Sequence, residues 1–245
     1  MADAFLGVDV GTSGVKAILV DSAGEVVASA MTALTLSTPR PGWAEQDPEA
    51  WWRASAASIR QVVGAAPGVR VGGVGISGQM HSSVFLDRAG EVIRPALLWC
   101  DGRTTAECAE ITDRVGGEER LRDLAVNPAL EGFTLPKVLW LRNHEPDAFG
   151  RLATVLLAKD YVRFRLTGAL ATEPSDASAT LMYDTARLRW SDEIMGAMEL
   201  PMSLLPAVGG SSEVLGRVTA DAAGLTGLAE GTPVVGGGAD NACGA

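Results

Sequence analysis

The chain has 245 residues, a net charge of −10 and 47% hydrophobic residues. A chain of this length buries roughly 70–75% of the surface that it exposes when unfolded, and its composition is that of a globular protein, not a disordered one. The acidic balance argues against a nucleic-acid partner, which would favour a basic surface. No apolar stretch approaches about 20 residues, so we expect no membrane span. The three cysteines lack a paired spacing, which favours reduced thiols and a cytoplasmic location.

The start of the chain is rich in β-forming residues. Runs at 5–10, 15–20 and 25–30 are separated by short polar or glycine-rich turns. Connections this short cannot cross over a sheet, so they predict an antiparallel meander. The segment 39–48 is predicted to be irregular. Asp47 and Pro48 then have the residue types that begin a helix, which we expect to run from Glu49 to about Gly64.

The remaining elements alternate between strands and helices. We expect strands at 69–77, 83–87, 92–99, 154–158 and 233–238. We expect helices at 104–115, 135–143, 146–149, 159–166 and 220–224, the last of these ending a looser mixture that begins near 169. A meander followed by this alternation is typical of the actin-like, ribonuclease-H-like α/β fold, in which helices cover both faces of a mixed sheet.

A glycine-rich turn follows the first predicted strand and carries several groups suited to a phosphate. Gly11 and a second glycine three positions later allow a tight hairpin, and Thr12, Ser13 and Lys16 add hydroxyls and a cation. Asp9, just before the turn, can reach Mg²⁺ through water. The alternative is a hairpin without a ligand, but the preceding aspartate favours phosphate. The turn lacks the Walker A pattern.

The segment 73–78 matches the Gly-x-Gly-x-x-Gly pattern of dinucleotide-binding proteins. That interpretation requires a helix to begin there, whereas 79–87 has β character, so glycines at a strand end are the better explanation. Gln79 and His81 follow. Their side chains offer donors and acceptors to a polyhydroxylated ligand, although a lone histidine is more often structural.

Trp99, Asp101 and Arg103 fall within five positions at a predicted strand-to-helix turn. A tryptophan face suits the apolar face of a sugar, while Asp101 and Arg103 could bind hydroxyls. Equally, the two charged residues could pair with each other beside a core tryptophan. Both interpretations remain open.

Asp240 and Asn241 follow a run of glycines at 236–238. A carboxylate at a helix N-terminus is stabilised in its ionised form and can accept a proton from a hydroxyl that attacks phosphorus. The alternative is that Asp240 is only an N-cap. Asp176 and Asp184 are interpreted as surface or capping carboxylates.

Together these stretches resemble the FGGY carbohydrate kinases, and among them the xylulokinases. The matching stretches are 7–16, 41–52, 75–81, 98–103, 159–161, 172–178 and 236–241, in the family's order. Preference for the xylulokinases rests on Gly-Gln-Met-His at 78–81 and Trp-x-Asp-Gly-Arg at 99–103.

The resemblance implies ATP- and Mg²⁺-dependent phosphorylation of D-xylulose at its 5-hydroxyl. Asp240 would be the general base. The sugar contacts would be Gln79, Met80, His81, Asp101 and Asn241. The phosphates and Mg²⁺ would be served by Asp9, Gly11, Thr12, Ser13 and Lys16. Phosphoryl transfer depends on in-line positioning and charge neutralisation, and such a set of residues supplies both.

The resemblance also implies a second actin-like domain that holds the adenine and closes over the sugar. The chain stops five residues after Asp240, so we expect 1–245 to be the sugar-binding half of a larger protein that transfers phosphate poorly by itself. A homodimer is compatible with the resemblance. The alternatives are a kinase for another ketose, polyol or sugar acid, and a non-catalytic actin-like sugar sensor.

Overall fold

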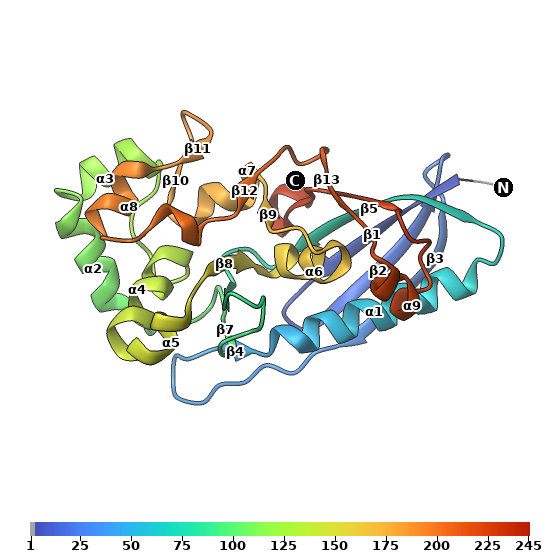
Figure 1. Ribbon diagram of the computed structural model, residues 1–245, viewed down its shortest axis with the longest axis horizontal. Coiled ribbons are helices and arrows are strands. Elements are labelled where there is room, and N and C mark those ends of the chain that lie inside the picture. Colours follow the sequence, from blue (N-terminus) through green and yellow to red (C-terminus); the bar gives the residue numbers. More distant parts are fainter. Residues whose placement is uncertain (1–2) are drawn as a thin grey trace.

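The computed structural model describes residues 3–245, and a mixed seven-stranded sheet lies at its centre (Figure 1). The strand order is β13-β14-β5-β1-β2-β3, and β15 also pairs with β5. The strands are β1 (Asp3–Val10), β2 (Gly14–Asp21), β3 (Val26–Ala33), β5 (Arg70–Gly78), β13 (Val214–Arg217), β14 (Pro233–Val235) and β15 (Gly238–Ala239).

The predicted antiparallel meander is confirmed. β1 pairs with β2 and β2 pairs with β3 in antiparallel register, while β5, β14 and β15 join in parallel. Side chains along β1 alternate between buried and exposed positions, as expected for a strand with one face on the core. β5 ends at Gly78 in a turn without a helix, so the dinucleotide interpretation of 73–78 is excluded.

One face of the sheet packs against α1 (Pro48–Ala65), α6 (Ala158–Thr167) and α9 (Ala220–Thr226) (Figure 1). As predicted, Asp47 is the N-cap of α1, where its side chain accepts a hydrogen bond from the Glu49 amide, and Pro48 is the first helical residue. The buried stripe of α1 includes two hydroxyls besides its apolar residues. Of these, Ser58 donates to the Val15 carbonyl oxygen at 3.2 Å, which ties the helix to β2.

The opposite face of the sheet is more open. The short helix α10 (Asp240–Cys243) lies at one end of it, and a groove of about 340 Å³ runs beside the helix. Further along the same face, Phe5 and Met31 are 55% and 69% exposed. The mixed sheet of the predicted fold is therefore confirmed, with most of the helical cover on one side.

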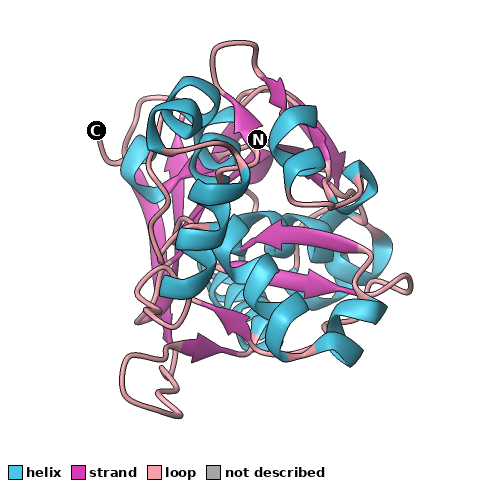
Figure 2. Ribbon diagram, turned by 90° about the vertical axis from the view of Figure 1, so that its left-hand side faces the viewer, coloured by secondary structure: helices cyan, strands magenta, loops and turns pink. Residues whose placement is uncertain are grey.

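A second lobe holds a separate hydrophobic core around the sheet β4-β7-β6-β8, and Figure 2 views the molecule from that end. Its sheet contains β4 (Glu45–Gln46), β7 (Ala96–Leu97), β6 (Ser83–Leu86) and β8 (Thr154–Leu157). Its helices are α2 (Thr105–Arg114), α3 (Glu118–Ala125), α4 (Thr134–His144), α5 (Pro146–Arg151) and α8 (Asp192–Ala197). The smaller elements are β9 (Ala171–Thr172), α7 (Pro174–Ala177), η1 (Ser178–Thr180), β10 (Tyr183–Asp184), β11 (Arg189–Trp190), η2 (Met202–Leu204) and β12 (Ala207–Val208).

Three expectations about secondary structure were wrong in detail, and one helix was not predicted. The segment 39–48 is not wholly irregular, because β4 forms a short pair with β7. The predicted strand at 92–99 shrinks to β7, and the helix α3 was not predicted. The predicted strand at 233–238 divides into β14 and β15, because Gly237 between them has a φ of +76°, outside the extended region.

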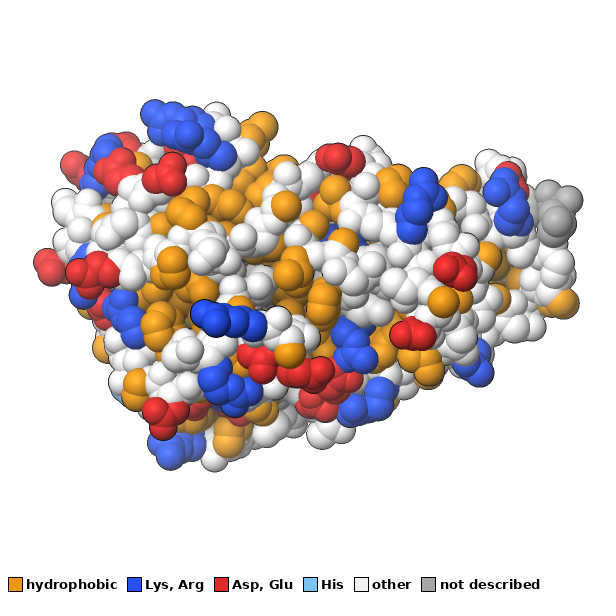
Figure 3. Space-filling model, viewed as in Figure 1, with side chains coloured by type: hydrophobic (Ala, Val, Ile, Leu, Met, Phe, Trp, Pro, Cys, Tyr) orange, Lys and Arg blue, Asp and Glu red, His pale blue; other side chains and the backbone are white. Residues whose placement is uncertain are grey.

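Charged side chains of both signs are scattered over the face in Figure 3, without one large basic area. Among residues 3–245, no helix combines the length and apolar character that crossing a bilayer requires.

Candidate active site

The two glycine-flanked aspartates of the sequence meet at the end of β5. Asp9, near the end of β1, is in register with Ser77 on one side of β5. On the other side, Gly238 is in register with the same Ser77, and Asp240 follows two residues later. Asp9, Ser77 and Lys16 line the groove of about 340 Å³ on the open face of the sheet. The structure thus brings together residues more than 200 positions apart.

The pKa of Asp9 is raised above its ordinary value. Partial burial is the main cause, and the negative charge of Asp240 is the next; a hydrogen bond with Ser77 and the charge of Lys16 act in the opposite direction. Two carboxylates that repel each other across a strand end form a site that attracts a cation or a proton.

The predicted phosphate turn is a tight hairpin, but part of its hydrogen-bonding capacity is already used. The Gly11 amide donates to the Gly14 carbonyl oxygen at 3.1 Å. The Thr12 hydroxyl donates to Gln79 at 3.2 Å and accepts from the Trp99 indole nitrogen at 3.1 Å. Ser13 and Lys16 have exposed side chains, so these two retain the freedom that a phosphate ligand would need.

Gln79 was predicted to contact the sugar, but its side chain is buried, with 1% exposure. Its amide nitrogen donates to Gln46 at 3.0 Å and to the Gly11 carbonyl oxygen at 3.4 Å. Its amide oxygen accepts from Thr12 and from Ser82 at 3.1 Å. With both ends of the amide occupied, Gln79 joins the hairpin to the turn after β5.

Met80 and His81 form that turn. The Asn241 amide nitrogen lies 3.1 Å from the Met80 sulfur, which connects the turn to α10. His81 is 9% exposed and adopts a φ of +62°, a region that few non-glycine residues occupy. Burial, as the main cause, lowers its pKa to about 4, so the ring is neutral near pH 7.

The left-handed turn at His81 is held from both sides. The His81 Nδ1 lies 3.0 Å from the Ala179 carbonyl oxygen. The buried ammonium of Lys137 donates to the His81 carbonyl oxygen at 2.9 Å and to the Gly132 carbonyl oxygen at 2.6 Å. In a neutral ring whose Nδ1 is the donor, Nε2 carries the lone pair and can accept a hydrogen bond. Lys137 was not singled out in the sequence, since its partners come from two other segments.

Asp101 was also predicted as a sugar contact. In the structure its geometry matches the alternative, in which Asp101 pairs with Arg103. Its carboxylate accepts from the Ala44 amide at 2.6 Å and from the Arg103 guanidinium at 2.8 and 2.7 Å. Arg103 itself lies between the rings of Trp43 and Trp140, 3.6 and 4.7 Å from their centroids. This arrangement is a buried scaffold. Its neighbour Trp99, in contrast, is 49% exposed beside the hairpin.

The glycines before Asp240 are required by close packing. A Cβ atom on Gly237 would lie 1.9 Å from the Ile76 carbonyl oxygen, and one on Gly236 would lie 2.5 Å from that of Gly210. The amides of Gly236 and Gly237 donate to carbonyl oxygens of residues 213 and 211. These N–H groups are therefore engaged within the protein, unlike those of an anion-binding loop.

Asp240 is the first residue of α10, and Ala239 is the N-cap position without a side-chain hydrogen bond. The alternative that Asp240 is a simple N-cap is therefore wrong. Its half-buried carboxylate is free of a capping role, although its Oδ1 accepts from the Asn241 amide at 2.9 Å.

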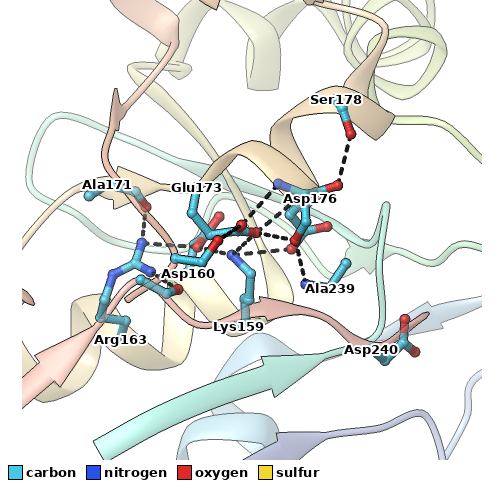
Figure 4. A network of polar contacts seen from close by, with 12 residues as sticks. Lys159, Asp160, Arg163, Ala171, Glu173, Asp176, Ser178, Ala239 and Asp240 are labelled. Carbon is cyan, nitrogen blue, oxygen red and sulfur yellow. Dashed lines mark hydrogen bonds and ion pairs between the residues drawn. The ribbon is translucent and has the colours of Figure 1, made fainter. Parts of the chain in front are cut away.

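Behind Asp240 lies a buried ionic cluster formed by Lys159, Asp160, Arg163, Glu173 and Asp176 (Figure 4). The Lys159 ammonium lies 2.7 Å from Asp160, 3.4 Å from Glu173 and 3.3 Å from Asp176. Arg163 pairs with Asp160 at 2.9 Å. The prediction that Asp176 is a surface or capping residue is wrong, because it is 1% exposed. Burial, chiefly, raises its pKa to about 7.

Asp184 is buried as well, and it closes a local turn. Its carboxylate accepts from the Arg187 amide at 2.9 Å and pairs with the Arg187 guanidinium at 2.7 Å.

The described residues contain no group of three or more His, Cys, Asp or Glu side chains able to hold a metal ion. Mg²⁺ commonly takes only one or two protein carboxylates, with water and substrate phosphates as its other ligands. Asp9, half-open to the groove, fits that demand.

The mixed sheet has the strand order of an actin-like fold. Its candidate ligand-binding groups lie where the parallel strands β1 and β5 end. Residues 4–245 match the N-terminal domain of the FGGY family of carbohydrate kinases, so the chain belongs to that family.

The chain is similar to several named proteins of this family. The chain is 46% identical over 242 residues to a xylulose kinase of Klebsiella pneumoniae, covering 98% of this chain and 49% of the relative. The crystal structure of a xylulose kinase from Rhodospirillum rubrum superposes with a TM-score of 0.93 at 36% identity, over 97% of this chain and 49% of that one. A gluconate kinase structure from Lactobacillus acidophilus gives a TM-score of 0.92 at 25% identity, over 98% and 48%. The chain thus spans about half the length of the relatives that it matches.

Proposed function

We propose that this chain is the sugar-binding half of a kinase that transfers the γ-phosphate of ATP to the 5-hydroxyl of D-xylulose. The observation that carries the proposal is the approach of Asp9 and Asp240 at the end of β5, beside a turn that presents Met80 and His81. The higher identity to the xylulose kinases of Klebsiella pneumoniae and Rhodospirillum rubrum than to the gluconate kinase supports xylulose as the substrate.

In the proposed reaction, the sugar 5-hydroxyl oxygen attacks the γ-phosphorus while the bond to the leaving ADP oxygen breaks. Asp240 accepts the proton of that hydroxyl. General-base catalysis of this kind contributes typically about 10²- to 10⁴-fold in rate. The half-buried carboxylate at the start of α10 suits this role, because it lies close to Asp9 at the end of β5 and takes no part in capping the helix.

The sugar would lie on the turn after β5. Met80 and Asn241 already contact each other at 3.1 Å, and together they close one side of the site. The neutral His81 ring can accept a hydrogen bond from a sugar hydroxyl at Nε2. Trp99, half-exposed, offers an indole face for the apolar side of the sugar. Gln79 and Asp101 support these residues from beneath and do not touch the ligand.

The nucleotide phosphates would face the hairpin of residues 11–14 and Lys16. Asp9 would hold Mg²⁺ through water, and the ion would neutralise charge on the phosphates when bound. Lys16 and the Ser13 hydroxyl supply the remaining polar contacts from this chain. A further actin-like half would bind the adenine, and without it we expect weak transfer. The homodimer compatible with the sequence remains a prediction.

The test is a substrate panel with the protein encoded by the complete gene. ADP release is measured in the presence of Mg-ATP and D-xylulose, D-ribulose, glycerol or D-gluconate. The proposal requires kcat/KM for D-xylulose to exceed each of the others by at least about 10-fold. A preference for another sugar would overturn the substrate assignment. Sugar binding without any ADP release would support the sensor hypothesis instead.

A further inference from the structure

The segment 236–240, which ends at Asp240, is held by side chains that belong to the buried ionic cluster. The Arg163 guanidinium donates to the Gly236 carbonyl oxygen at 2.9 Å. The Ala239 amide donates to the Ser175 hydroxyl oxygen at 3.0 Å. Figure 4 shows Ala239 and Asp240 beside the cluster, on the strand that leads into α10.

Ser175 is itself fixed by the cluster. Its hydroxyl donates to Glu173 Oε1 at 2.7 Å, and its amide donates to Glu173 Oε2 at 2.9 Å. Glu173 in turn faces the Lys159 ammonium at 3.4 Å. A continuous chain of polar contacts therefore runs from Lys159 through Glu173 and Ser175 to the amide just before Asp240.

Apart from its backbone pairing with β5 and its amide contacts with residues 211 and 213, the segment has few means of positioning itself. Residues 236–238 are glycines and provide no side chains to pack, and glycine is the most flexible residue in an unrestrained chain. The cluster, in contrast, is rigid, since Lys159, Asp160 and Arg163 are fully buried. The cluster also costs folding free energy, because buried oxygens of Asp160 and Asp176 lack hydrogen-bond partners and buried charges rarely add stability. Its contacts with the segment suggest that it serves position rather than stability.

We propose that Ser175 is a positioning residue: by accepting the Ala239 amide, it transmits the rigidity of the ionic cluster to Asp240. This inference rests on the proposed function, in which Asp240 is the general base. Small displacements of a reacting group can cost about 10²-fold in rate, so loss of this one hydrogen bond would be visible in kcat.

The chain offers a matched control in Ser211. The Ser211 hydroxyl also donates to Glu173, at 2.8 Å. Among the described residues, the side chain that accepts from the Ala239 amide is Ser175 and not Ser211. Ser175→Ala and Ser211→Ala therefore each remove one hydrogen bond to Glu173, but only the first frees the Ala239 amide.

The experiment compares both variants in the complete enzyme. For Ser175→Ala we expect kcat with D-xylulose to fall at least about 10-fold with KM within about 3-fold, whereas Ser211→Ala keeps kcat within about 3-fold. Ser175→Thr, which retains the hydroxyl, should recover most of kcat. Equal kcat values for the two alanine variants would overturn the inference. Absence of wild-type turnover would instead overturn the proposed function.

A second measurement does not depend on activity. Hydrogen exchange of the Ala239 amide in the 245-residue chain should be at least about 10-fold faster in Ser175→Ala than in Ser211→Ala. If Ser175→Ala does not fold, Ser175→Thr and Ser175→Cys are compared with wild type in the same way. If the exchange rate of the Ala239 amide is unchanged in every folded variant that lacks the hydroxyl, the proposed role of Ser175 in holding that amide is wrong.

Discussion

Asp9 and Asp240 lie on opposite sides of the end of β5, and the charge of Asp240 contributes to the raised pKa of Asp9. Burial is the larger cause of that shift. The two residues come from opposite ends of the chain, so their proximity depends on the parallel pairing of both β1 and β15 with β5. This pairing places Asp9 and Lys16 of the first two strands and Cys243 of α10 along the same groove.

The first prediction concerns this electrostatic coupling. Asp240→Asn removes a neighbouring negative charge without changing the size of the side chain, so the pKa of Asp9 should fall. The measurement is an NMR titration of the Asp9 carboxyl carbon in the chain. Asp221→Asn, which removes an exposed carboxylate on α9, is the control and should leave the Asp9 titration unchanged. An unchanged Asp9 pKa in Asp240→Asn would show that the carboxylates do not interact.

The second prediction separates Gln79 from the sugar contacts. Because its amide is buried and bonded at both ends, Gln79→Ala should lower the free energy of unfolding by about 2–4 kcal/mol. Gln61→Ala, at an exposed position of α1, should change it by less than about 0.5 kcal/mol. Urea denaturation measures both. A stable Gln79→Ala variant that had lost sugar affinity would restore Gln79 as a ligand contact.

The third prediction tests why glycines precede Asp240. Gly237 and Gly231 both have positive φ, +76° and +82°, which costs alanine about 1–2 kcal/mol. Only at Gly237 would a Cβ atom also meet backbone, 1.9 Å from the Ile76 carbonyl oxygen. Gly237→Ala should therefore be destabilised by at least about 2 kcal/mol more than Gly231→Ala in thermal or urea unfolding. Equal losses would mean that the close approach to β5 is absent in solution.

The fourth prediction concerns Asp176 and pH. Its pKa in the folded protein is raised from its ordinary value of 3.8 to about 7, because burial outweighs the attraction of Lys159, and Asp160 and Glu173 add repulsion. Between about pH 4 and 7 the folded state therefore binds more protons at this site than the unfolded state. Stability contributed by the protonated form is lost as the pH rises through that window.

Asp176→Asn keeps the neutral form at every pH. Its stability relative to wild type should therefore increase from pH 4 to pH 7, by about 1 kcal/mol or more. The control is Asp184→Asn, because hydrogen bonds with Arg187 lower the pKa of Asp184. The difference in the free energy of unfolding between Asp184→Asn and wild type should not change between pH 5 and 7. If the same difference for Asp176→Asn does not change with pH, the Asp176 carboxyl group is ionised throughout.

Local patterns predicted much of the fold. The meander, the start of α1 at Pro48 and the end of α6 before Gly168, which has a φ of +75°, follow from turn residues and caps that act within a few positions. The helix α3 also left a signal, because Leu121, Leu124 and Ala125 are buried at helical spacing. The many charged residues around them made this spacing hard to recognise in the sequence.

The error at Asp176 has a different origin. The burial of Asp176 depends on partners from other elements, such as Lys159 of α6, and the buried hydrogen bonds of Gln79 likewise involve Gln46 of β4. No spacing within the sequence brings these partners together. The family resemblance named the stretches that contribute to the site, but it could not distinguish side chains that face the groove from those that support it from beneath.

The central claim is that Asp240 accepts the proton of the sugar hydroxyl. The most direct test measures kcat and the D-xylulose Kd for Asp240→Asn in the complete enzyme, with calorimetry for binding. We predict that kcat falls by about 10²- to 10⁴-fold while the Kd stays within about 3-fold. A variant that kept more than about a tenth of the wild-type kcat would contradict the assignment of Asp240 as the base.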